Sequence, residues 1–377
     1  MQHREYQQRA IEYLCATRRG ILKAPAGAGK THIAASALDR CLRNRKERAK
    51  VEIMVNTREQ VEQMETACAR FDIESKCDLK IYCAAGAPVG TKPDLIIVDE
   101  CHRSSAPTWS AKIAECDGGR WGLSATPYDD KEADQIATIK RLFTERIHSI
   151  ERGELVDNGH LSKARVIWRN VDCECVAAKI ESLAGDLIEK RRKKMPYLFR
   201  TDENGNPTPK MREQINQCRW QAAQQIGVWE NEIRDYLIVS EANRRVADGH
   251  HVIILVGKIE HGERLLPAIP GAVLCYSGMG KKRRREAIEG FKAGDIRALI
   301  ATSMLDEGFD APIADCIILA SAGKSARKTI QSTGRVLRKF DGKDCGIVID
   351  FKDLFHPMLA RQSQARRGIY KGLKYIF

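Results

Sequence analysis

The sequence of 377 residues has no apolar run long enough to cross a membrane. Its N-terminus, MQHREYQQRA, has no apolar signal region and is typical of the start of an amphipathic helix. There is also no sequence-level repeat and no extended low-complexity segment. The composition, 43% hydrophobic and 30% charged residues, is that of a soluble globular protein, and the length suffices for two domains.

The 13 cysteines include no CxxC pair, and only Cys173 and Cys175 are closely spaced. Their number is odd and they are scattered through apolar segments, which argues against a disulfide framework or a zinc site. We therefore expect reduced, buried thiols and a cytoplasmic protein. The sequence also shows no cluster of metal-ligating residues of the nuclease type, which disfavours a nuclease within this chain.

Acidic residues are the minority among the charged ones. The 50 Asp and Glu stand against 63 Lys and Arg, for a formal charge of +13. This excess favours a polyanionic partner such as nucleic acid. Charge by itself identifies neither the polymer nor the reaction.

Short apolar runs recur along the chain, separated by helical or polar stretches. Before residue 130 they are GILKAP, VEIMVNT, LKIYCAA, DLIIVDE and RWGLSATP; a later series is HHVIILVGK, AVLCYSG, IRALIATS, DCIILASA and CGIVIDFK. Strands buried on both faces have this composition, so we predict two α/β domains, each a parallel sheet flanked by helices. We expect them at 1–150 and 151–377, with a helical insert at 175–240, which is rich in charge and glutamine.

The stretch KAPAGAGKTH, which begins at Lys23, contains the pattern AxxGxGKT. It differs from the phosphate-loop pattern GxxxxGK[ST] in having Ala24 at the first glycine position. Glycines would turn backbone N–H groups toward phosphate, the lysine would neutralise the β and γ phosphates, and the threonine hydroxyl would bind magnesium. The alternative is a flexible turn before a helix. The predicted ATP-binding residues of this loop are Ala26, Gly27, Ala28, Gly29, Lys30 and Thr31.

A second motif, DLIIVDECH, ends a very apolar run with two carboxylates, Asp99 and Glu100. Buried charges there would be costly without a partner, and a magnesium ion supplies one. Asp99 would hold the metal, and Glu100 would orient and deprotonate the attacking water. A pair of exposed carboxylates at a strand end is the alternative.

The order of these motifs resembles that of superfamily 2 helicases of the DExH type, over nearly the whole chain outside the insert. The resemblance implies two tandem RecA-like domains with ATP and Mg²⁺ bound between them. In REYQQRAI, it implies that Gln7 recognises the base edge of ATP and that Arg4 packs beside it. In DECH and LSATP, it implies a coupling role for His102 and for the hydroxyl pair Ser124 and Thr126.

The second half of the chain carries the remaining motifs of this resemblance. QSTGRVLR resembles the arginine-bearing motif, which implies that Gln331 lies by the hydrolysis site and that Arg335 and Arg338 reach the γ-phosphate. Gly308 and Asp310, in the GxDxP ending of the preceding block, would help to close the cleft. The alternative for the two arginines is a solvent-exposed helix face.

The resemblance also implies a nucleic-acid track on both domains, contacted mainly through its phosphate backbone. The residues expected to contact it are Thr57, Arg58, Gly257, Lys258 and Thr302. SIERGELVDNGHLSKARV and GIVIDF resemble the UvsW-like and XPB-like helicases of phages and bacteria, which act on DNA. We therefore expect DNA rather than RNA as the partner, no membrane, and a monomer.

The role of two basic segments is undecided at this point. Residues 281–285, KKRRR, extend the track or form a solvated helix face. The run EKRRKK, followed by Trp220 and Trp229, forms an additional duplex-gripping element or belongs to a bundle in which both tryptophans pack the core.

The leading functional hypothesis is an ATP-dependent DNA helicase or translocase. Alternatives are an ATP-driven remodeller or branch-migration motor, and an ATP-switched subunit of a larger complex. A small-molecule kinase would share the phosphate loop but not the later motifs. The chain after Asp350 is short, with no recognisable accessory domain, so strong processive unwinding is not expected.

Overall fold

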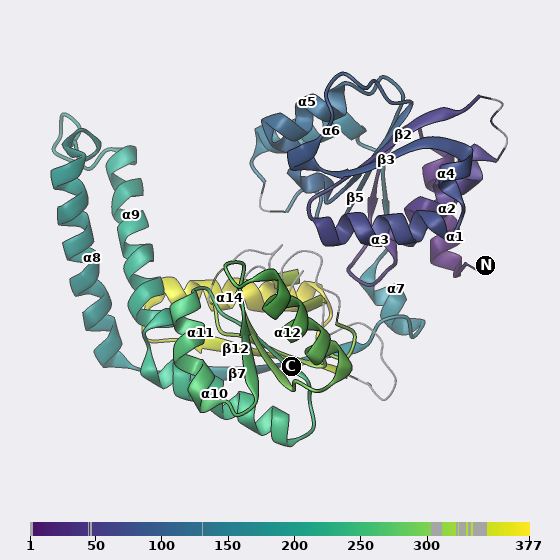
Figure 1. Ribbon diagram of the computed structural model, residues 1–377. Helices are drawn as coiled ribbons and strands as arrows, with labels where there is room; N and C mark the ends of the chain where they lie inside the picture. The colour runs from purple at the N-terminus through teal and green to yellow at the C-terminus, as the bar shows by residue number, and fades with distance from the viewer. Residues whose placement is uncertain are drawn as a thin grey trace. The chain divides into compact units, whose positions relative to one another are not determined.

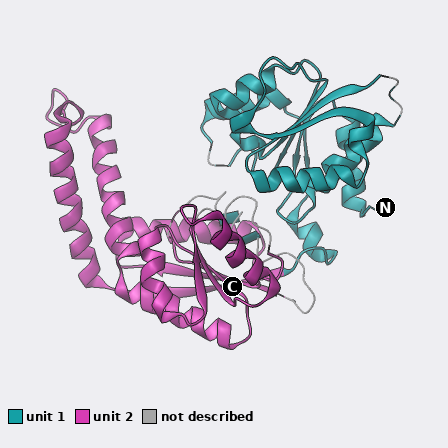
Figure 2. Ribbon diagram, in the orientation of Figure 1, with its two compact units in different colours: residues 1–162, 306–310, 326–339 teal, residues 163–305, 311–325, 340–377 magenta. Residues whose placement is uncertain are grey.

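The computed structural model describes residues 3–43, 45, 47–129, 131–302, 311–321, 323, 329, 330, 333, 334 and 345–377. The chain forms two compact units, the first built on Met1–Ser162 and the second on most of the chain that follows (Figures 1 and 2). Among the described residues, no helix is both long and apolar enough to cross a membrane.

Unit 1 contains a six-stranded sheet in the order β3-β2-β4-β5-β1-β6. Every strand pair in it is parallel. The strands are β1 (Arg19–Lys23), β2 (Ala49–Val55), β3 (Cys77–Cys83), β4 (Leu95–Asp99), β5 (Gly119–Ser124) and β6 (Ile147–Ser149). The helices are α1 (Glu5–Ala16), α2 (Lys30–Leu42), α3 (Arg58–Ala69), α4 (Ile73–Lys76), α5 (Pro107–Ala114), α6 (Ala133–Phe143) and α7 (Arg152–Asp157).

Both faces of this sheet are buried, as its continuous apolar strands require. On β4, Ile97 packs in a core that includes residues of α1, α2 and α3. Its neighbours Ile96 and Val98 point to the opposite face, into a core with residues of α5 and α6. The helices therefore cover both sides and leave the carboxyl ends of the strands as the place where polar loops gather.

Unit 2 contains a second six-stranded parallel sheet, in the order β7-β12-β11-β8-β10-β9. Its strands are β7 (Lys163–Val171), β8 (Val252–Leu255), β9 (Ala272–Cys275), β10 (Ala298–Ala301), β11 (Cys316–Leu319) and β12 (Cys345–Asp353). The helices that pack around it include α10 (Glu232–Ala247), α11 (Ile259–Leu265), α12 (Lys281–Ala293) and α14 (Pro357–Gly372).

A helical hairpin extends from unit 2, formed by α8 (Glu174–Lys194) and α9 (Pro209–Gln224), which run side by side (Figure 1). Its foot continues through a π-helical turn, Gln225–Trp229, into α10. A cluster that contains Ile180, Ala222 and Leu359 packs this foot against α14. The hairpin is therefore attached to the unit by an apolar core of its own.

The prediction of two parallel sheets flanked by helices is confirmed. All ten apolar runs named from the sequence are strands, whereas the short β6 and the half-exposed edge strand β7 were not predicted. The expected boundary at residue 150 lies between β6 and α7, and the two units divide after Ser162. The segment 175–240 contains the hairpin and also the first half of α10, which packs on the sheet.

Candidate functional site

Three of the predicted motifs meet at the carboxyl edge of the unit 1 sheet. Strand β5 lies between β1 and β4, and the register pairs Lys23 with Ser124 and Asp99 with Leu123. The glycine-rich loop after β1, the carboxylates after β4 and the hydroxyls after β5 therefore start from neighbouring positions. Ligands of open parallel sheets bind at such an edge.

The glycine-rich loop has the backbone of an anion-binding turn. Gly27 and Gly29 have φ angles of 85° and 81°, the left-handed region that glycine adopts without strain. Gly29 is the N-cap of α2, and Lys30 is the first helical residue. The Lys30 ammonium donates to the carbonyl oxygen of Ala24 at 3.2 Å and so lies over the loop. The two left-handed glycines, the N-terminus of α2 and the Lys30 ammonium thus belong to one short loop, as an anion-binding site requires.

Ala24 is compatible with this turn although the motif has glycine there. Its φ is not positive, and its side chain is fully buried in the unit 1 core. Its N–H donates to the carbonyl oxygen of Ser124 at 3.0 Å, which joins the start of the loop to the end of β5. The departure from the pattern therefore carries no backbone strain.

Helix α1 brings Gln7 and Arg4 to the same loop. A Cβ atom on Gly29 would lie 3.2 Å from Gln7 Nε2, so the carboxamide and the glycine are neighbours. The other end of the carboxamide, Gln7 Oε1, accepts from the Arg4 N–H at 3.1 Å and caps the helix. The exposed Arg4 guanidinium donates to the Tyr6 hydroxyl at 3.4 Å. The adenine-reading residues of the prediction thus lie beside the phosphate loop.

The two carboxylates lie where β4 ends: Asp99 is its last residue, and Glu100 begins the turn that follows. Asp99 is only 8% exposed, and its Oδ1 accepts from the Glu100 N–H at 3.0 Å. Glu100 has a φ of 54°, which is unusual for a residue with a side chain. Such strain is found at functional sites, where the surroundings hold a side chain in a particular direction.

His102 connects Glu100 to the motif after β5. The buried His102 Nδ1 lies 3.2 Å from Glu100 Oε2 and 3.3 Å from Ser124 Oγ. Ser124 Oγ in turn accepts from the Thr126 N–H at 3.1 Å. Burial by itself raises the pKa of Glu100, but the hydrogen bond to His102 and the charge of Lys30 outweigh it, so the pKa lies below its usual value. Glu100 is therefore ionised at neutral pH.

The oxygen atoms at this edge suit magnesium rather than a softer metal. Thr31 lies in the first turn of α2, and Asp99 ends the neighbouring strand β4. One hydroxyl and one carboxylate leave room for phosphate oxygens and water, the ligands that magnesium prefers. Within the described ranges, no group of three or more His, Cys, Asp or Glu forms an all-protein metal site.

The predicted nucleic-acid contacts of unit 1 lie at the same edge, after β2. Thr57 is the N-cap of α3, and its hydroxyl accepts from the Gln60 N–H at 3.3 Å. Arg58 is exposed in the first turn of that helix. An exposed arginine in the first turn of a helix is suited to bind a backbone phosphate.

The corresponding residues of unit 2 follow β8 and β10. Gly257 and Lys258 are exposed between β8 and α11, and Thr302 is half-buried directly after β10. The remaining predicted residues lie outside the described part of the chain: Gly308, Asp310, Gln331, Arg335 and Arg338.

The two basic segments whose role the sequence left undecided, residues 281–285 and 189–194, have different surroundings. Four of the five residues 281–285 are exposed at the start of α12. The run 189–194 forms the end of α8, at the hairpin tip. Trp229 packs against the core at the hairpin foot, whereas Trp220, at 47% exposure, does not belong to a core.

Tyr6 is a site residue that the sequence analysis did not single out. It is buried, and its hydroxyl donates to the carbonyl oxygen of Ala28 in the phosphate loop at 3.2 Å. It stands between Arg4 and Gln7 in REYQ, so its position in the motif was the available signal. Tyr6 links helix α1 to the loop.

We expect Tyr6→Phe to raise the KM for ATP by about two- to tenfold, with a smaller effect on kcat. The reason is the loss of one hydrogen bond, worth about 0.5–1.5 kcal/mol, that fixes the loop. Steady-state ATP hydrolysis measures both constants. Tyr13→Phe is the matched control, because Tyr13 is on the same helix but donates to Arg146 O, away from the loop. An unchanged KM in Tyr6→Phe would contradict this role.

Comparisons with known proteins agree with the two-unit organisation. Residues 1–86 match the family model described as the Type III restriction enzyme res subunit, and residues 231–340 match the helicase conserved C-terminal domain. The first match contains the phosphate loop, and the second begins at the cap of α10.

Two similar proteins extend over almost the whole chain. A putative helicase of Sulfolobus islandicus filamentous virus is 24% identical over 94% of this chain, which spans 64% of the viral protein's length. The DNA 3'-5' translocase XPB2 of Sulfurisphaera tokodaii is 22% identical over 95% of this chain and 84% of its own length. Among solved structures, the Pyrococcus furiosus Hef helicase domain superposes with a TM-score of 0.57 at 15% identity, covering 97% of this chain and 98% of that domain.

Proposed function

We propose that this chain, which belongs to the superfamily 2 helicases, couples ATP hydrolysis to movement along DNA. Its two units are the tandem RecA-like domains of that superfamily. The observation that carries the proposal is the junction of three motifs at one sheet edge. There the P-loop, Glu100 and Ser124 are joined through Ala24 and His102 by contacts of 3.0–3.3 Å.

ATP binds with its phosphates in the turn formed by Gly27 and Gly29, and with its base near Gln7. Lys30 and the N-terminus of α2 place positive charge against the phosphates. Thr31 and Asp99 would hold a magnesium ion, which would supply positive charge against the phosphate oxygens. These groups fix ATP in position but provide no base for the attack of water.

Glu100 is that base. Its lowered pKa keeps it ionised, and the contact with His102 holds the carboxylate in one direction. His102 also contacts Ser124, so a change at the hydrolysis site reaches the motif after β5. We further propose that Gln331, Arg335 and Arg338, from the second half of the sequence, complete the site, and that Gly308 and Asp310 belong to its closing segment. Guanidinium groups would then meet the charge that develops on the γ-phosphate.

DNA binds across both domains through its backbone phosphates. The contacts are Thr57 and Arg58 on unit 1 and Gly257, Lys258 and Thr302 on unit 2. The +13 charge of the chain supports a polyanionic partner, and the archaeal relative's name, DNA 3'-5' translocase, supports DNA. We propose a monomer in the cytoplasm, where the 13 free thiols would stay reduced.

The testing experiment is steady-state ATP hydrolysis with magnesium, titrated with single-stranded DNA, duplex DNA and RNA. We expect strong stimulation by DNA and a weaker effect of RNA. Lys30→Ala should remove hydrolysis while the far-UV circular dichroism stays unchanged, because Lys30 is half-buried and supports no core. Turnover indifferent to all three polymers, or normal turnover in Lys30→Ala, would overturn the proposal.

A second candidate function is ATP-driven remodelling or branch migration without processive unwinding. The name of the archaeal relative, a DNA translocase, favours it. Forked and branched DNA substrates in a strand-displacement assay separate the two functions. Displacement on branched but not on long forked duplexes would favour the remodeller.

A further inference from the structure

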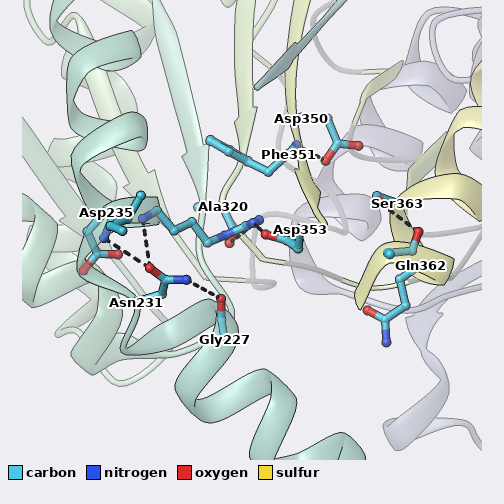
Figure 3. Close-up of polar contacts among 12 residues, drawn as sticks. Gly227, Asn231, Asp235, Ala320, Asp350, Phe351, Asp353, Gln362 and Ser363 are labelled. Carbon is cyan, nitrogen blue, oxygen red and sulfur yellow. Dashed lines mark hydrogen bonds and ion pairs between the residues drawn. The ribbon is translucent and has the colours of Figure 1, made fainter. Parts of the chain in front are cut away.

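The foot of the helical hairpin is a closely packed joint. Gly227 lies in its π-helical turn, and a Cβ atom there would come within 2.6 Å of Leu359 Cδ1 on α14. The side-chain amide of Asn231 donates to the carbonyl oxygen of Gly227 at 3.2 Å and satisfies this acceptor of the widened turn (Figure 3). Such turns are frequent at functional sites. The π-turn is therefore held in a defined position on unit 2.

The first turn of α10 connects the hairpin foot both to the sheet and to α11. Arg234 is fully buried, pairs with Asp353 of β12 and donates to the carbonyl oxygen of Ala320 after β11. Asp235 contacts α11 through His261 Nε2 at 2.9 Å and Arg264 Nε at 2.7 Å. The hairpin foot, the sheet and α11 are thus connected by charged contacts within one helical turn.

Trp229, the last residue of the π-turn, lies against the loop between β8 and α11. Its Nε1 atom is 2.8 Å from the place where a Cβ atom of Gly257 would stand. The ammonium of Lys258 is 5.1 Å from the centre of the indole ring, a cation–π distance. Nε1 is buried and has no hydrogen-bond partner within the described chain. The indole therefore packs against both Gly257 and Lys258 of this loop.

We propose that Trp229 is the positioning residue for Lys258 and joins the hairpin to the DNA-contacting loop of unit 2. The proposal rests on the proposed function, which makes Lys258 a phosphate contact. A free lysine side chain loses conformational entropy when it binds a phosphate, and an indole that already holds it reduces that loss. Because Trp229 is the last residue of the π-turn, a movement of the hairpin foot also moves the indole against which Lys258 packs.

The test is a double-mutant cycle on DNA affinity, measured by fluorescence anisotropy with a labelled single-stranded oligonucleotide at several salt concentrations. We expect Trp229→Leu to weaken binding about three- to fivefold. It should also reduce the salt dependence as Lys258→Gln does, by about 0.7 in the logarithmic slope. The double variant should bind no more weakly than Lys258→Gln. Trp229→Phe, which keeps a ring for the ammonium, should restore most of the affinity.

The matched control is Trp168→Leu. Trp168 forms a similar pair with Lys352, whose ammonium is 5.7 Å from the ring centre, but these residues lie on β7 and β12. DNA affinity should not change in this variant. Additive effects of Trp229→Leu and Lys258→Gln, or unchanged affinity in Trp229→Leu, would overturn the inference.

A second pair of variants covers the case in which Trp229→Leu does not fold. Gly257→Ala would push a methyl group against Trp229 Nε1 and should weaken binding to a similar degree. Trp229→Phe removes that atom, so combining it with Gly257→Ala should restore affinity; no restoration would overturn the inference. If the wild-type chain binds neither DNA nor RNA, the proposed function itself fails. If it binds but these variants do not weaken it, only the role of Trp229 fails.

Discussion

Glu100→Gln is expected to retain ATP binding and to hydrolyse ATP at least about 100-fold more slowly, because general-base catalysis contributes 10²–10⁴-fold. The substitution preserves the volume of the side chain and an oxygen atom for the contact with His102. It removes the negative charge that takes the proton from water. The lowered pKa of Glu100 means that the base is ionised in the wild type at neutral and mildly acidic pH.

The measurement is single-turnover hydrolysis together with the affinity for a fluorescent ATP analogue. The matched control is Glu145→Gln, since Glu145 is a carboxylate with 78% side-chain exposure whose ion pair, with Lys140, is on the surface. Turnover in that variant should equal that of the wild type. Normal hydrolysis in Glu100→Gln would assign the base to another residue and contradict the proposed role of the DECH motif.

The fold could be predicted from the sequence because fully buried parallel strands have continuous apolar runs. VIIL of β8 and CIIL of β11 are examples, and every residue in them is buried. The edge strand β7 has a mixed sequence, KARVIWRNV, with only three fully buried residues, so no periodicity marked it. Edge strands often carry charged residues, and Lys163, Arg165 and Arg169 interrupt the apolar sequence of β7.

The candidate site could be predicted from the sequence for residues whose side chains are expected to contact ATP, magnesium or water directly. Lys30, Asp99 and Glu100 belong to patterns whose spacing is set by phosphate and magnesium. Tyr6 and Trp229 act by packing against loops that are distant in the sequence: Tyr6 on Ala28, and Trp229 on Lys258. An aromatic residue in a helix gives no sign of its tertiary neighbour, so only the structure could identify the loop that each of these two contacts.

Arg234→Ala is expected to lower the free energy of unfolding of unit 2 by about 3–5 kcal/mol. Arg234 and Asp353 are both fully buried and paired with each other. The guanidinium also lies over the ring of Phe351, 4.4 Å from its centre. Removing the arginine leaves the buried carboxylate of Asp353 without its partner and deletes this packing. Urea denaturation followed by circular dichroism measures the loss.

The size of that effect reflects the cost of an unpaired charge, not the value of the ion pair, and a second variant separates the two. The double substitution Arg234→Met with Asp353→Leu removes both charges and keeps similar volume, so its stability should stay close to that of the wild type. Arg285→Ala breaks an exposed pair with Glu289 at 3.7 Å and should cost less than about 1 kcal/mol. A double variant as unstable as Arg234→Ala would show that the pair itself stabilises unit 2. In that case the first turn of α10 would depend on its charges to hold the hairpin foot, and apolar packing alone would not suffice.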